Sequence, residues 1–394
     1  MNERDQAHKS LGDVVIKPES ASYHRSQRIL SVTGYLVDLG VLIILLFGGW
    51  SAAIRSFAES LNPYPAVALL IYALVLGAIL KTVSLPFDYL GGFWLEHRYH
   101  LSNLTFGGWV KDEIKESLVG GVLGILGLEF LYWTLRAWPQ NWWLITGVIF
   151  TGFFILMANL APILILPIFF KLTPLSNPAL EVRLRRLAER AGTRVQGVYE
   201  WKLGEKTKKA NAALMGLGNT RRILLADTLL DGFSEDEVEA VLAHELGHHV
   251  HADIWRGLAT QTAATFLGLY VVSVGLAQWS GPLGFRSSSD FANLPLLALI
   301  LLMVSLLLLP VVNGLSRRME RAADSYAVRS IRDPAVLVSS FERLATLNLA
   351  ERRPPTWIEF VFHSHPSIEK RIEFIRRSHV VLAEETAISA KQAQ

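Results

Sequence analysis

Long apolar stretches alternate with polar segments along the chain, and six of these stretches are long enough to cross a membrane. A bilayer core about 30 Å thick requires roughly 20 apolar residues in a helix. The predicted spans cover residues 32–54, 64–85, 118–136, 142–165, 257–279 and 294–316. Buried helices of a soluble protein would also be apolar, but six such stretches in one chain favour membrane helices. The pattern therefore predicts a mainly α-helical, polytopic membrane protein.

The polar segments between and after the spans predict a globular domain outside the membrane, here called the head, whose sequence is divided by the last two spans. In chain order we expect an N-terminal arm (1–30), four spans (31–170), the first head segment (171–256), two spans (257–316), the second head segment (317–383) and a tail (384–394). Each head segment is small, so we expect the two to pack together. Residues 179–191 have the pattern of an amphipathic helix, whereas 195–201 and 222–226 have the pattern of strands. The head should therefore contain a small β-sheet.

Lysine and arginine are distributed unevenly among the connections, and this distribution predicts an orientation. If the N-terminus is cytoplasmic, the outer connections hold Arg55, Arg136 and Arg286 and no lysine. The inner connections hold the other basic residues. We therefore expect both termini and the head to be cytoplasmic. The six-span layout and the lack of an organelle-type presequence favour a bacterial inner membrane.

Composition narrows the possible chemistry. Apolar residues make up 51% of the chain and charged residues 19%, below the roughly 25% that is usual for soluble domains. The chain has no cysteine, which excludes disulfides and thiolate ligands. Any metal ion must therefore be held by His, Asp or Glu. A net charge of +3 without a dense basic block argues against a nucleic-acid partner.

The strongest motif is HELGHH, residues 244–249, which contains the pattern H-E-x-x-H. On a helix, His244 and His248 project from one face and can bind one zinc ion, with Glu245 beside the open coordination position. Ser234 and Glu237 form a predicted capping box at the start of this helix. Two solvated histidines are the alternative interpretation of the motif.

A catalytic zinc ion usually has three protein ligands and a water molecule. In this chain the third ligand has to be His, Asp or Glu, and the best candidate is Glu320 in SRRMERAADSYA, residues 316–327. Asp324 follows one turn later, where it could hydrogen-bond a ligand histidine. A Glu and an Asp on a helix usually form a solvated face, so the residues alone leave that alternative open.

The proposed chemistry is hydrolysis of a peptide bond. A bound zinc ion would activate a water molecule and polarise the scissile carbonyl. Glu245 would accept the proton of that water as general base. His365 and Arg371, in HSHPSIEKR, are candidates to stabilise the oxyanion. Periodicity alone indicates that both are surface residues of a short helix after Pro366.

Three motifs in this order, HELGHH, SRRMERAAD and SHPSIEKR, resemble those of the integral-membrane CAAX prenyl proteases and their bacterial relatives. The heat-shock HtpX-like peptidases are more distant in resemblance. Residues 93–115, 161–175 and 209–230 also resemble characteristic segments of the family. The resemblance covers roughly residues 64–374, and its motifs are specific in combination. Together with the six predicted spans, it implies a membrane protein with a split, zincin-like α+β peptidase head.

The resemblance also implies roles for individual residues. The zinc ligands, one ion per chain, fall on His244, His248 and Glu320. The general base falls on Glu245. The acid that supports a ligand histidine falls on Asp324.

Four further positions match residues that act on the substrate in this family. His365 and Arg371 fall on residues that assist the transition state. Asn211 and Ala212 fall where the family binds the peptide backbone beside the metal. An edge strand that pairs with the substrate would hold the scissile bond near the metal with little demand on sequence.

One departure from the family concerns the membrane helices. Eukaryotic members resemble a seven-helix barrel around a large chamber, whereas this chain has six predicted spans and lacks the first. The departure bears on whether a closed chamber forms and whether the substrate is prenylated. Asp38 and Glu129 lie inside predicted spans, where charge is costly. They face either a water-filled cavity or a polar neighbour at a helix crossing.

We therefore predict a membrane-embedded zinc metalloendopeptidase that cleaves peptide or protein substrates within or at a bilayer. Candidate substrates are prenylated peptides, misfolded membrane proteins and lipoprotein fragments. Two alternatives are a transporter with a metal-binding head and an inactive scaffold descended from a peptidase. Few charges lie in the spans, which disfavours the transporter, and intact Glu245 disfavours the scaffold because metal binding alone does not require it.

Overall fold

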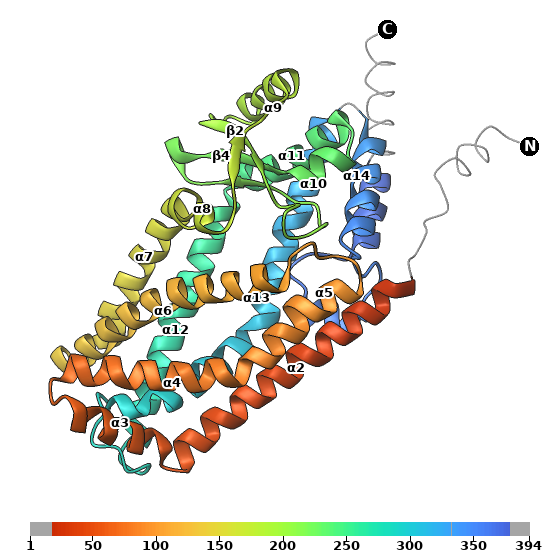
Figure 1. Cartoon of the computed structure of the whole chain (residues 1–394). Coiled ribbons are helices and arrows are strands. Elements are labelled where there is room, and N and C mark those ends of the chain that lie inside the picture. The colour runs from red at the N-terminus through yellow and green to blue at the C-terminus, as the bar shows by residue number, and fades with distance from the viewer. Residues whose placement is uncertain (1–17, 332, 379–394) are drawn as a thin grey trace, which may run out of the picture.

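The computed structural model describes residues 18–331 and 333–378. Within these residues, six helical stretches are long and apolar enough to cross a membrane: Glu19–Phe47, Pro65–Arg98, Phe106–Ala137, Trp142–Phe169, Asp253–Trp279 and Phe291–Ser330. They carry a smaller head of helices and a short sheet at one end (Figure 1). The predicted fold class is confirmed. The predicted tail and the first 17 residues of the arm lie outside the described residues.

The spanning helices form a closed ring. They are α2 (Pro18–Phe47), α4 (Pro65–Asp88), α6 (Phe106–Ala137), α7 (Trp142–Leu164), α12 (Asp253–Trp279) and α13 (Leu294–Ser330). Each packs against the next in this order, and α13 packs against α2 to complete the ring. At the end away from the head, one apolar core draws all six together, with Leu45, Leu69, Tyr132, Trp142, Val272 and Leu297 among its members.

The middle of the ring is not filled by side chains. No residue is buried over 24–44 of α2, 110–130 of α6 or 254–267 of α12, and the other three helices have similar stretches. In a close-packed bundle the inward face of each helix would be buried. The ring is therefore hollow between its apolar core and the head, although it has six helices.

Two acidic residues predicted to lie within spans have different surroundings. Asp38 lines a cavity of about 650 Å³ between α2, α4 and α6. Asp88 and Glu113 line the same cavity, and the Lys81 Nζ lies 2.8 and 2.6 Å from their carboxylates. For Asp38, a polar cavity is therefore the better of the two predicted surroundings. Glu129 is half-buried in α6 and does not line this cavity.

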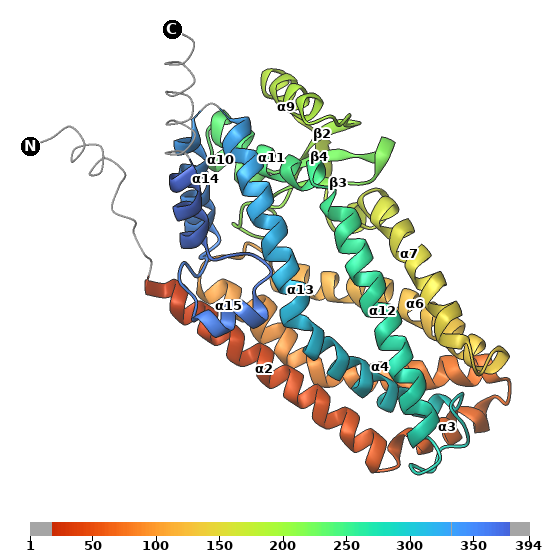
Figure 2. The same ribbon diagram turned by 180° about the vertical axis from the view of Figure 1, so that it is seen from behind.

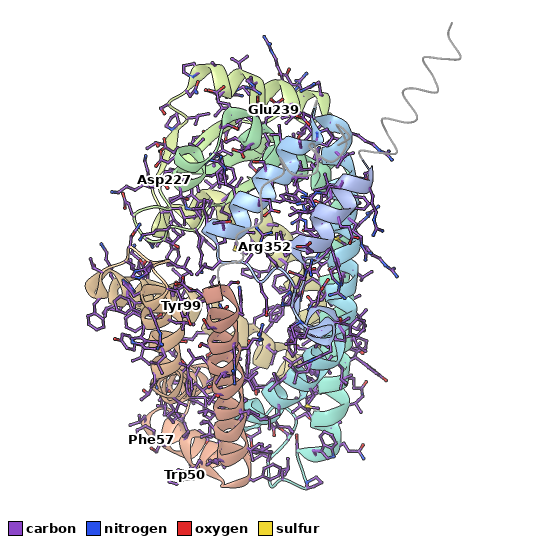
Figure 3. All side chains as sticks on the ribbon, turned by 90° about the vertical axis from the view of Figure 1, so that its right-hand side faces the viewer. Trp50, Phe57, Tyr99, Asp227, Glu239 and Arg352 are labelled. Carbon is purple, nitrogen blue, oxygen red and sulfur yellow. The ribbon has the colours of Figure 1, made fainter. Side chains whose placement is uncertain are left out.

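The first predicted span, 32–54, is wrong in its bounds. Helix α2 already begins at Pro18, inside the predicted arm, and ends at Phe47. Gly49 then adopts a φ of 73°, which glycine tolerates without strain, and α3 (Trp50–Leu61) begins. Most of the predicted outer loop is thus an amphipathic helix. Figure 3 shows Trp50 and Phe57 of this helix at the end of the molecule opposite the head.

The second predicted span, 64–85, also ends later than expected. Helix α4 passes Pro86 and continues as a π-helical turn, η1 (Tyr89–Trp94), and as α5 (Leu95–Arg98). Helix α7 ends at Leu164, one residue before the end predicted at 165, and the short α8 (Leu166–Phe169) follows it. Proline removes one intrahelical hydrogen bond, but tertiary packing carries the helix past it. The chain after α5 then reaches the head, where the Asn103 N–H donates to the Lys206 carbonyl at 2.9 Å.

The head contains a four-stranded mixed sheet in the order β1-β2-β4-β3. Its strands are β1 (Leu172–Pro174), β2 (Gly197–Trp201), β3 (Ala212–Met215) and β4 (Arg222–Ala226), with the 3-10 turn η2 (Gly218–Thr220) between the last two. Strand β4 runs parallel to β2 and antiparallel to β3, so β3 is an edge strand. The sequence predicted β2 and β4 as strands.

Helices from both head segments cover the sheet and share one apolar core. They are α9 (Pro178–Arg190), α10 (Asp227–Gly232), α11 (Glu235–Val250), α14 (Pro334–Leu347) and a helix over residues 368–378, with the head-proximal end of α13. Two small elements lie elsewhere: η3 (Phe291–Asn293) before α13, and α15 (Thr356–Phe362) after α14. The two head segments therefore pack into one body.

Candidate metal centre and active site

Helix α11 carries the H-E-x-x-H motif, and its start is fixed by the predicted capping box. The Ser234 Oγ accepts a hydrogen bond from the Glu237 N–H, and Glu237 Oε2 accepts one from the Ser234 N–H at 2.9 Å. Val238, Leu242 and Leu246 are buried in the head core. This helix is thus held at its N-terminus and along its apolar face, which fixes the direction of its histidines.

A close approach of two helices brings the third candidate ligand to α11. A Cβ placed on Gly247 would lie 2.7 Å from the Cα of Ala323 on α13, which is too close for any real contact. Gly247 therefore allows the two backbones to touch. Helix α13 runs from the membrane into the head without a break, and Glu320 lies one turn before Ala323. The predicted last span and the predicted ligand segment are thus one helix.

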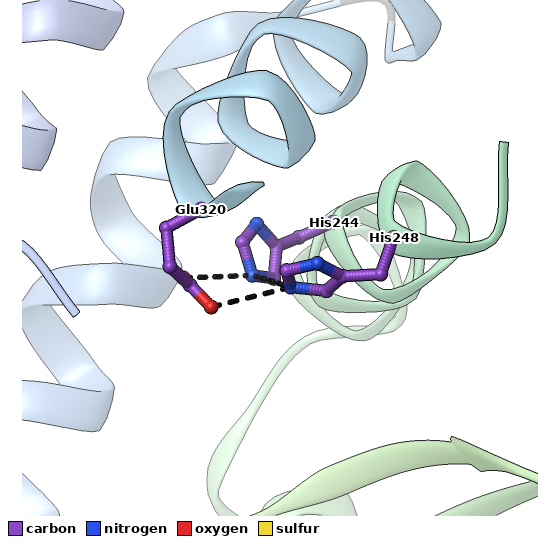
Figure 4. Close-up of side chains that lie close together, drawn as sticks. All are labelled: His244, His248 and Glu320. Atoms are coloured by element: carbon purple, nitrogen blue, oxygen red, sulfur yellow. Dashed lines mark hydrogen bonds and ion pairs between the residues drawn. The ribbon is translucent and has the colours of Figure 1, made fainter. Parts of the chain in front are cut away.

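The three predicted ligands meet at one point (Figure 4). The two Nε2 atoms of His244 and His248 lie 3.2 Å apart. Glu320 Oε1 lies 3.3 Å from the His248 Nε2, and its Oε2 lies 3.5 Å from the His244 Nε2. Among the described residues, these three side chains could hold a metal ion, whereas His249 and His251 are not part of the group.

The donor atoms fit a small divalent cation. Tetrahedral zinc with ligand distances of about 2.0–2.1 Å requires ligand atoms roughly 3.3 Å apart, close to the three separations seen here. The Glu320 Oε2 is buried and accepts no hydrogen bond from the described residues, so a metal ion would supply the close partner that this anionic oxygen lacks. Two imidazoles and a carboxylate are also a usual ligand set for catalytic zinc.

Each candidate ligand histidine has its own carboxylate partner. Asp324 Oδ1 lies 2.9 Å from the His244 Nδ1, as the sequence predicted. Asp253 Oδ2 lies 3.0 Å from the His248 Nδ1, a contact that the sequence analysis missed. Such contacts orient the ring and leave Nε2 free to bind a metal. In the sequence, the only indication of this contact was an acidic residue five positions after His248. In the structure, a turn at Ala252 with a φ of 56° lies between the two.

The Arg371 side chain is only 10% exposed, contrary to the surface position that periodicity indicated. Its Nε lies 2.9 Å from Asp324 Oδ2 and its Nη2 lies 2.7 Å from Asp324 Oδ1, a two-point contact. The Nη2 also lies 3.5 Å from Glu320 Oε2, and the guanidinium stacks 4.2 Å above the Phe341 ring. Arg371 therefore compensates two buried carboxylates and fixes their positions.

A cleft of about 350 Å³ opens onto these residues. Glu245 and Arg371 line it together with the three candidate ligands, as do the predicted substrate-binding residues Asn211 and Ala212. His365 also lines it, is largely exposed, and places its Nδ1 2.9 Å from Glu320 Oε1. The structure therefore brings together every residue that the sequence analysis singled out for this site.

Burial and charge perturb the titrating groups on α11. Burial and Arg371 oppose a proton on His244, but its contacts with Asp324 and Glu320 outweigh them and raise its pKa to about 9. Burial likewise opposes a proton on His248, but Glu320 and Asp253 raise its pKa above the usual value. Burial raises the pKa of Glu245. A less acidic Glu245 holds a proton more readily, as a general base requires.

Comparison with known proteins places the whole chain in one class. The model of "Peptidase family M48" matches residues 174–379, and the model of "CAAX prenyl protease N-terminal, five membrane helices" matches residues 17–171. These two regions hold the head with its metal centre and the first four spans. Fold and site thus define a multi-pass membrane metallopeptidase. The chain belongs to peptidase family M48, in its CAAX prenyl protease branch.

Individual relatives agree with this assignment. The Bacillus subtilis metalloprotease YhfN, described as uncharacterized, is 29% identical over 89% of this chain and 83% of its own length. CAAX prenyl protease 1 of Saccharomyces cerevisiae is 27% identical over 76% of this chain and 70% of its own. The crystal structure of Saccharomyces mikatae Ste24p superposes with a TM-score of 0.80 at 23% identity, covering 91% of this chain and 87% of that one.

The comparisons confirm three predictions: the family, the mainly helical membrane fold with its small sheet, and the metalloprotease class of enzyme. They also bear on the number of membrane helices. The N-terminal family model is described as having five, whereas the described residues have four candidate spans before Lys171. The chain therefore still differs from its relatives in having fewer candidate membrane helices among its described residues.

Proposed function

We propose that this protein is a zinc endopeptidase that cleaves peptide bonds at the boundary between a bilayer and its head. One observation carries the proposal: His244, His248 and Glu320 converge at metal-binding distances in a cleft that also contains Glu245. Family M48 supports a metal cofactor in general terms, and the nitrogen–nitrogen–oxygen donor set supports zinc, one ion per chain.

In this proposal His244, His248 and Glu320 would hold the zinc ion, which would supply a water molecule that is acidic near neutral pH and a Lewis acid for the substrate carbonyl. Glu245 takes the proton from that water and later delivers it to the leaving amine. His365 is an exposed polar group that lines the cleft beside Glu320, so it donates to the developing oxyanion. Arg371 contacts Asp324 and Glu320, so it acts by holding these carboxylates in position.

The substrate backbone adds to the free edge of β3. The Asn211 carbonyl accepts a hydrogen bond from the Ala226 N–H, and antiparallel pairing alternates from there. The backbone groups of Ala212 and Leu214 therefore point away from β4, toward the unpaired edge. An extended peptide that pairs with this edge would pass the candidate metal centre, because Asn211 and Ala212 line the same cleft.

The hollow ring and the relatives suggest the class of substrate. Yeast CAAX prenyl protease 1 is named for prenylated substrates. A ring that is hollow at membrane depth could hold an apolar chain while the peptide reaches the head. We infer that the natural substrates are membrane-bound or lipidated, and the candidates are prenylated peptides, misfolded membrane proteins or lipoprotein fragments.

The proposed orientation places the head and both termini in the cytoplasm, in a bacterial inner membrane. The basic residues of the end away from the head are few, and two of them are paired with acids. Arg55 forms a buried ion pair with Asp290, and Arg286 Nη1 lies 2.6 Å from Glu59 Oε1. The positive-inside rule counts lysine and arginine residues, and their small number at this end supports the proposed orientation.

The decisive experiment replaces the proposed general base. Glu245→Gln should retain one zinc per chain and the melting temperature of the parent, while peptide cleavage falls by about 10²–10⁴-fold or more. Glu205→Gln is the matched control, because Glu205 is exposed and pairs with Lys171 on the head surface. Normal cleavage by Glu245→Gln would refute the mechanism. Identifying peptides trapped by that variant from whole membranes would define the substrate.

A further inference from the structure

Helix α15 exposes an unusual set of aromatic side chains. Trp357, Phe360 and Phe362 are 64%, 59% and 52% exposed. In the head residues 171–249 and 317–378, these three are the aromatic side chains that remain exposed. The Trp357 and Phe362 rings lie 6.3 Å apart, and three exposed aromatic side chains on a seven-residue helix are a concentration that a water-exposed head would not favour.

The opposite side of α15 is fixed to the head. Ile358 and Glu359 are buried. The Glu359 carboxylate accepts hydrogen bonds from the Ser367 N–H at 3.3 Å and from the Lys370 Nζ at 3.0 Å. The helix therefore has a side anchored in the protein, while its three aromatic side chains each remain more than half exposed.

Contacts with the spanning helices place α15 at the edge of the membrane. The Asn313 Nδ2 donates to the Val361 carbonyl at 2.7 Å, and the Arg317 Nη1 donates to the Glu359 carbonyl at 3.0 Å. Asn313 lies inside the apolar run of α13, and Arg317 is the first charge after it. Helix α15 thus lies beside the last apolar turn of α13, well below α14 (Figure 2).

The loop before α15 is tied to a second spanning helix. The Ser20 Oγ donates to the Leu349 carbonyl at 2.9 Å, and Arg28 pairs with Glu351. Both contacts lie just before the apolar part of α2 begins. Arg352, labelled in Figure 3 between the head and the spanning helices, continues this loop toward α15. The segment therefore bridges the membrane ends of α2 and α13.

We propose that α15 lies in the interfacial layer of the bilayer, with Trp357, Phe360 and Phe362 among the lipids. These lipids belong to the leaflet that surrounds the head-proximal end of α13. Val311 and Val312 are exposed on α13 and continue the lipid-facing surface of that helix up to α15. Aromatic side chains are enriched at this depth, where an apolar ring meets polar headgroups.

This position couples the bilayer to the proposed active site. The chain leaves the cleft at Asn348 and Ala350, passes through α15, and returns to the cleft at His365. Only two residues separate Phe362 from His365. Lipid contact at α15 therefore positions His365, a consequence that rests on the proposed function.

The absence of cysteine allows a direct test of depth. Trp357→Cys, Leu307→Cys and Val182→Cys would each carry one environment-sensitive fluorophore in phosphatidylcholine–phosphatidylglycerol vesicles. Leu307 is 72% exposed in the middle of α13, and Val182 is 47% exposed on α9. We expect spin-labelled lipids to quench the labels at Trp357 and Leu307, but not at Val182. Quenching at Trp357 by aqueous iodide alone, as at Val182, would overturn the proposal. This readout does not depend on catalysis.

A second measurement tests the coupling. Trp357→Ser combined with Phe360→Ser should leave the melting temperature in detergent unchanged, because both side chains are exposed. In vesicles the same variant should cleave a water-soluble peptide several-fold more slowly, while its rate in detergent equals that of the parent. Equal rates in vesicles would refute the coupling to His365. Loss of activity in detergent as well would show a merely structural role for the two residues.

Discussion

Asp253 Oδ2 lies 3.0 Å from His248 Nδ1, so the first residue of a membrane helix contacts a candidate metal ligand. Asp253 is buried, and a single left-handed residue, Ala252, separates α12 from the turn that follows α11. The orientation of the metal centre is therefore tied directly to the membrane domain. Asp324 makes the equivalent contact with His244 from α13, which also enters the membrane.

Removal of this contact should weaken metal binding. Asp253→Ala leaves the His248 Nδ1 without an acceptor, so we expect the affinity for zinc to fall by about 10–100-fold. Competition with a chromogenic chelator would measure the change. The control is Asp231→Ala, which removes an exposed acid from the end of α10. Equal zinc affinity in both variants would show that Asp253 does not support the ligand.

The close approach of α11 and α13 makes a steric prediction. Gly247→Ala places a methyl group against the Ala323 backbone, which must move away and take Glu320 with it. We expect the free energy of unfolding to fall by about 1–3 kcal/mol, together with a loss of zinc affinity. Gly257→Ala is the matched control, because a Cβ at this helical position meets nothing within 4 Å. A stable Gly247→Ala protein with normal zinc affinity would contradict the argument.

The raised pKa of His244 predicts proton release when metal binds. In the metal-free protein this pKa is about 9, above the unfolded value near 6.5, so His244 is protonated at neutral pH. Its charge therefore stabilises the metal-free fold fully below pH 6.5, and that stabilisation is lost as pH rises through about 9. Zinc requires the neutral ring, so binding at pH 7.5 should release about one proton from His244.

Isothermal titration of zinc in buffers with different ionisation enthalpies would count the protons released. Asp324→Asn removes one of the contacts that favour the charged imidazole, so this variant should release fewer protons. Binding heats that are independent of the buffer would contradict the prediction.

Pairing of the substrate with β3 predicts an alternating requirement along the peptide. N-methylation of a substrate residue removes one backbone donor. Each lost hydrogen bond costs roughly 0.5–1.5 kcal/mol, and the methyl group also disrupts pairing sterically. Methylation at alternate positions should therefore reduce kcat/KM by about tenfold or more. The intervening positions provide the control, because their N–H groups point away from β3. A uniform response along the peptide would argue against strand addition.

Parts of this molecule could be read directly from local sequence. The capping box at Ser234 and the strand at 222–226 depend on neighbouring residues, and both lie where they were expected. The bounds of the first span could not be predicted, because apolar content alone does not show that the chain reverses at Gly48 and Gly49. The second span was predicted to end at residue 85, yet the helix continues past Pro86.

The sequence by itself determined the membrane character, the six apolar helices and the H-E-x-x-H ligand pair, because each depends on periodicity or composition within one stretch of chain. The tertiary structure decided what depends on contact between distant stretches. Burial of Arg371 against Asp324, the contact of Asp253 with His248, and the approach of Glu320 through Gly247 all arise where separate helices pack. Local patterns specify which face of a helix is apolar, but only packing specifies which face it meets.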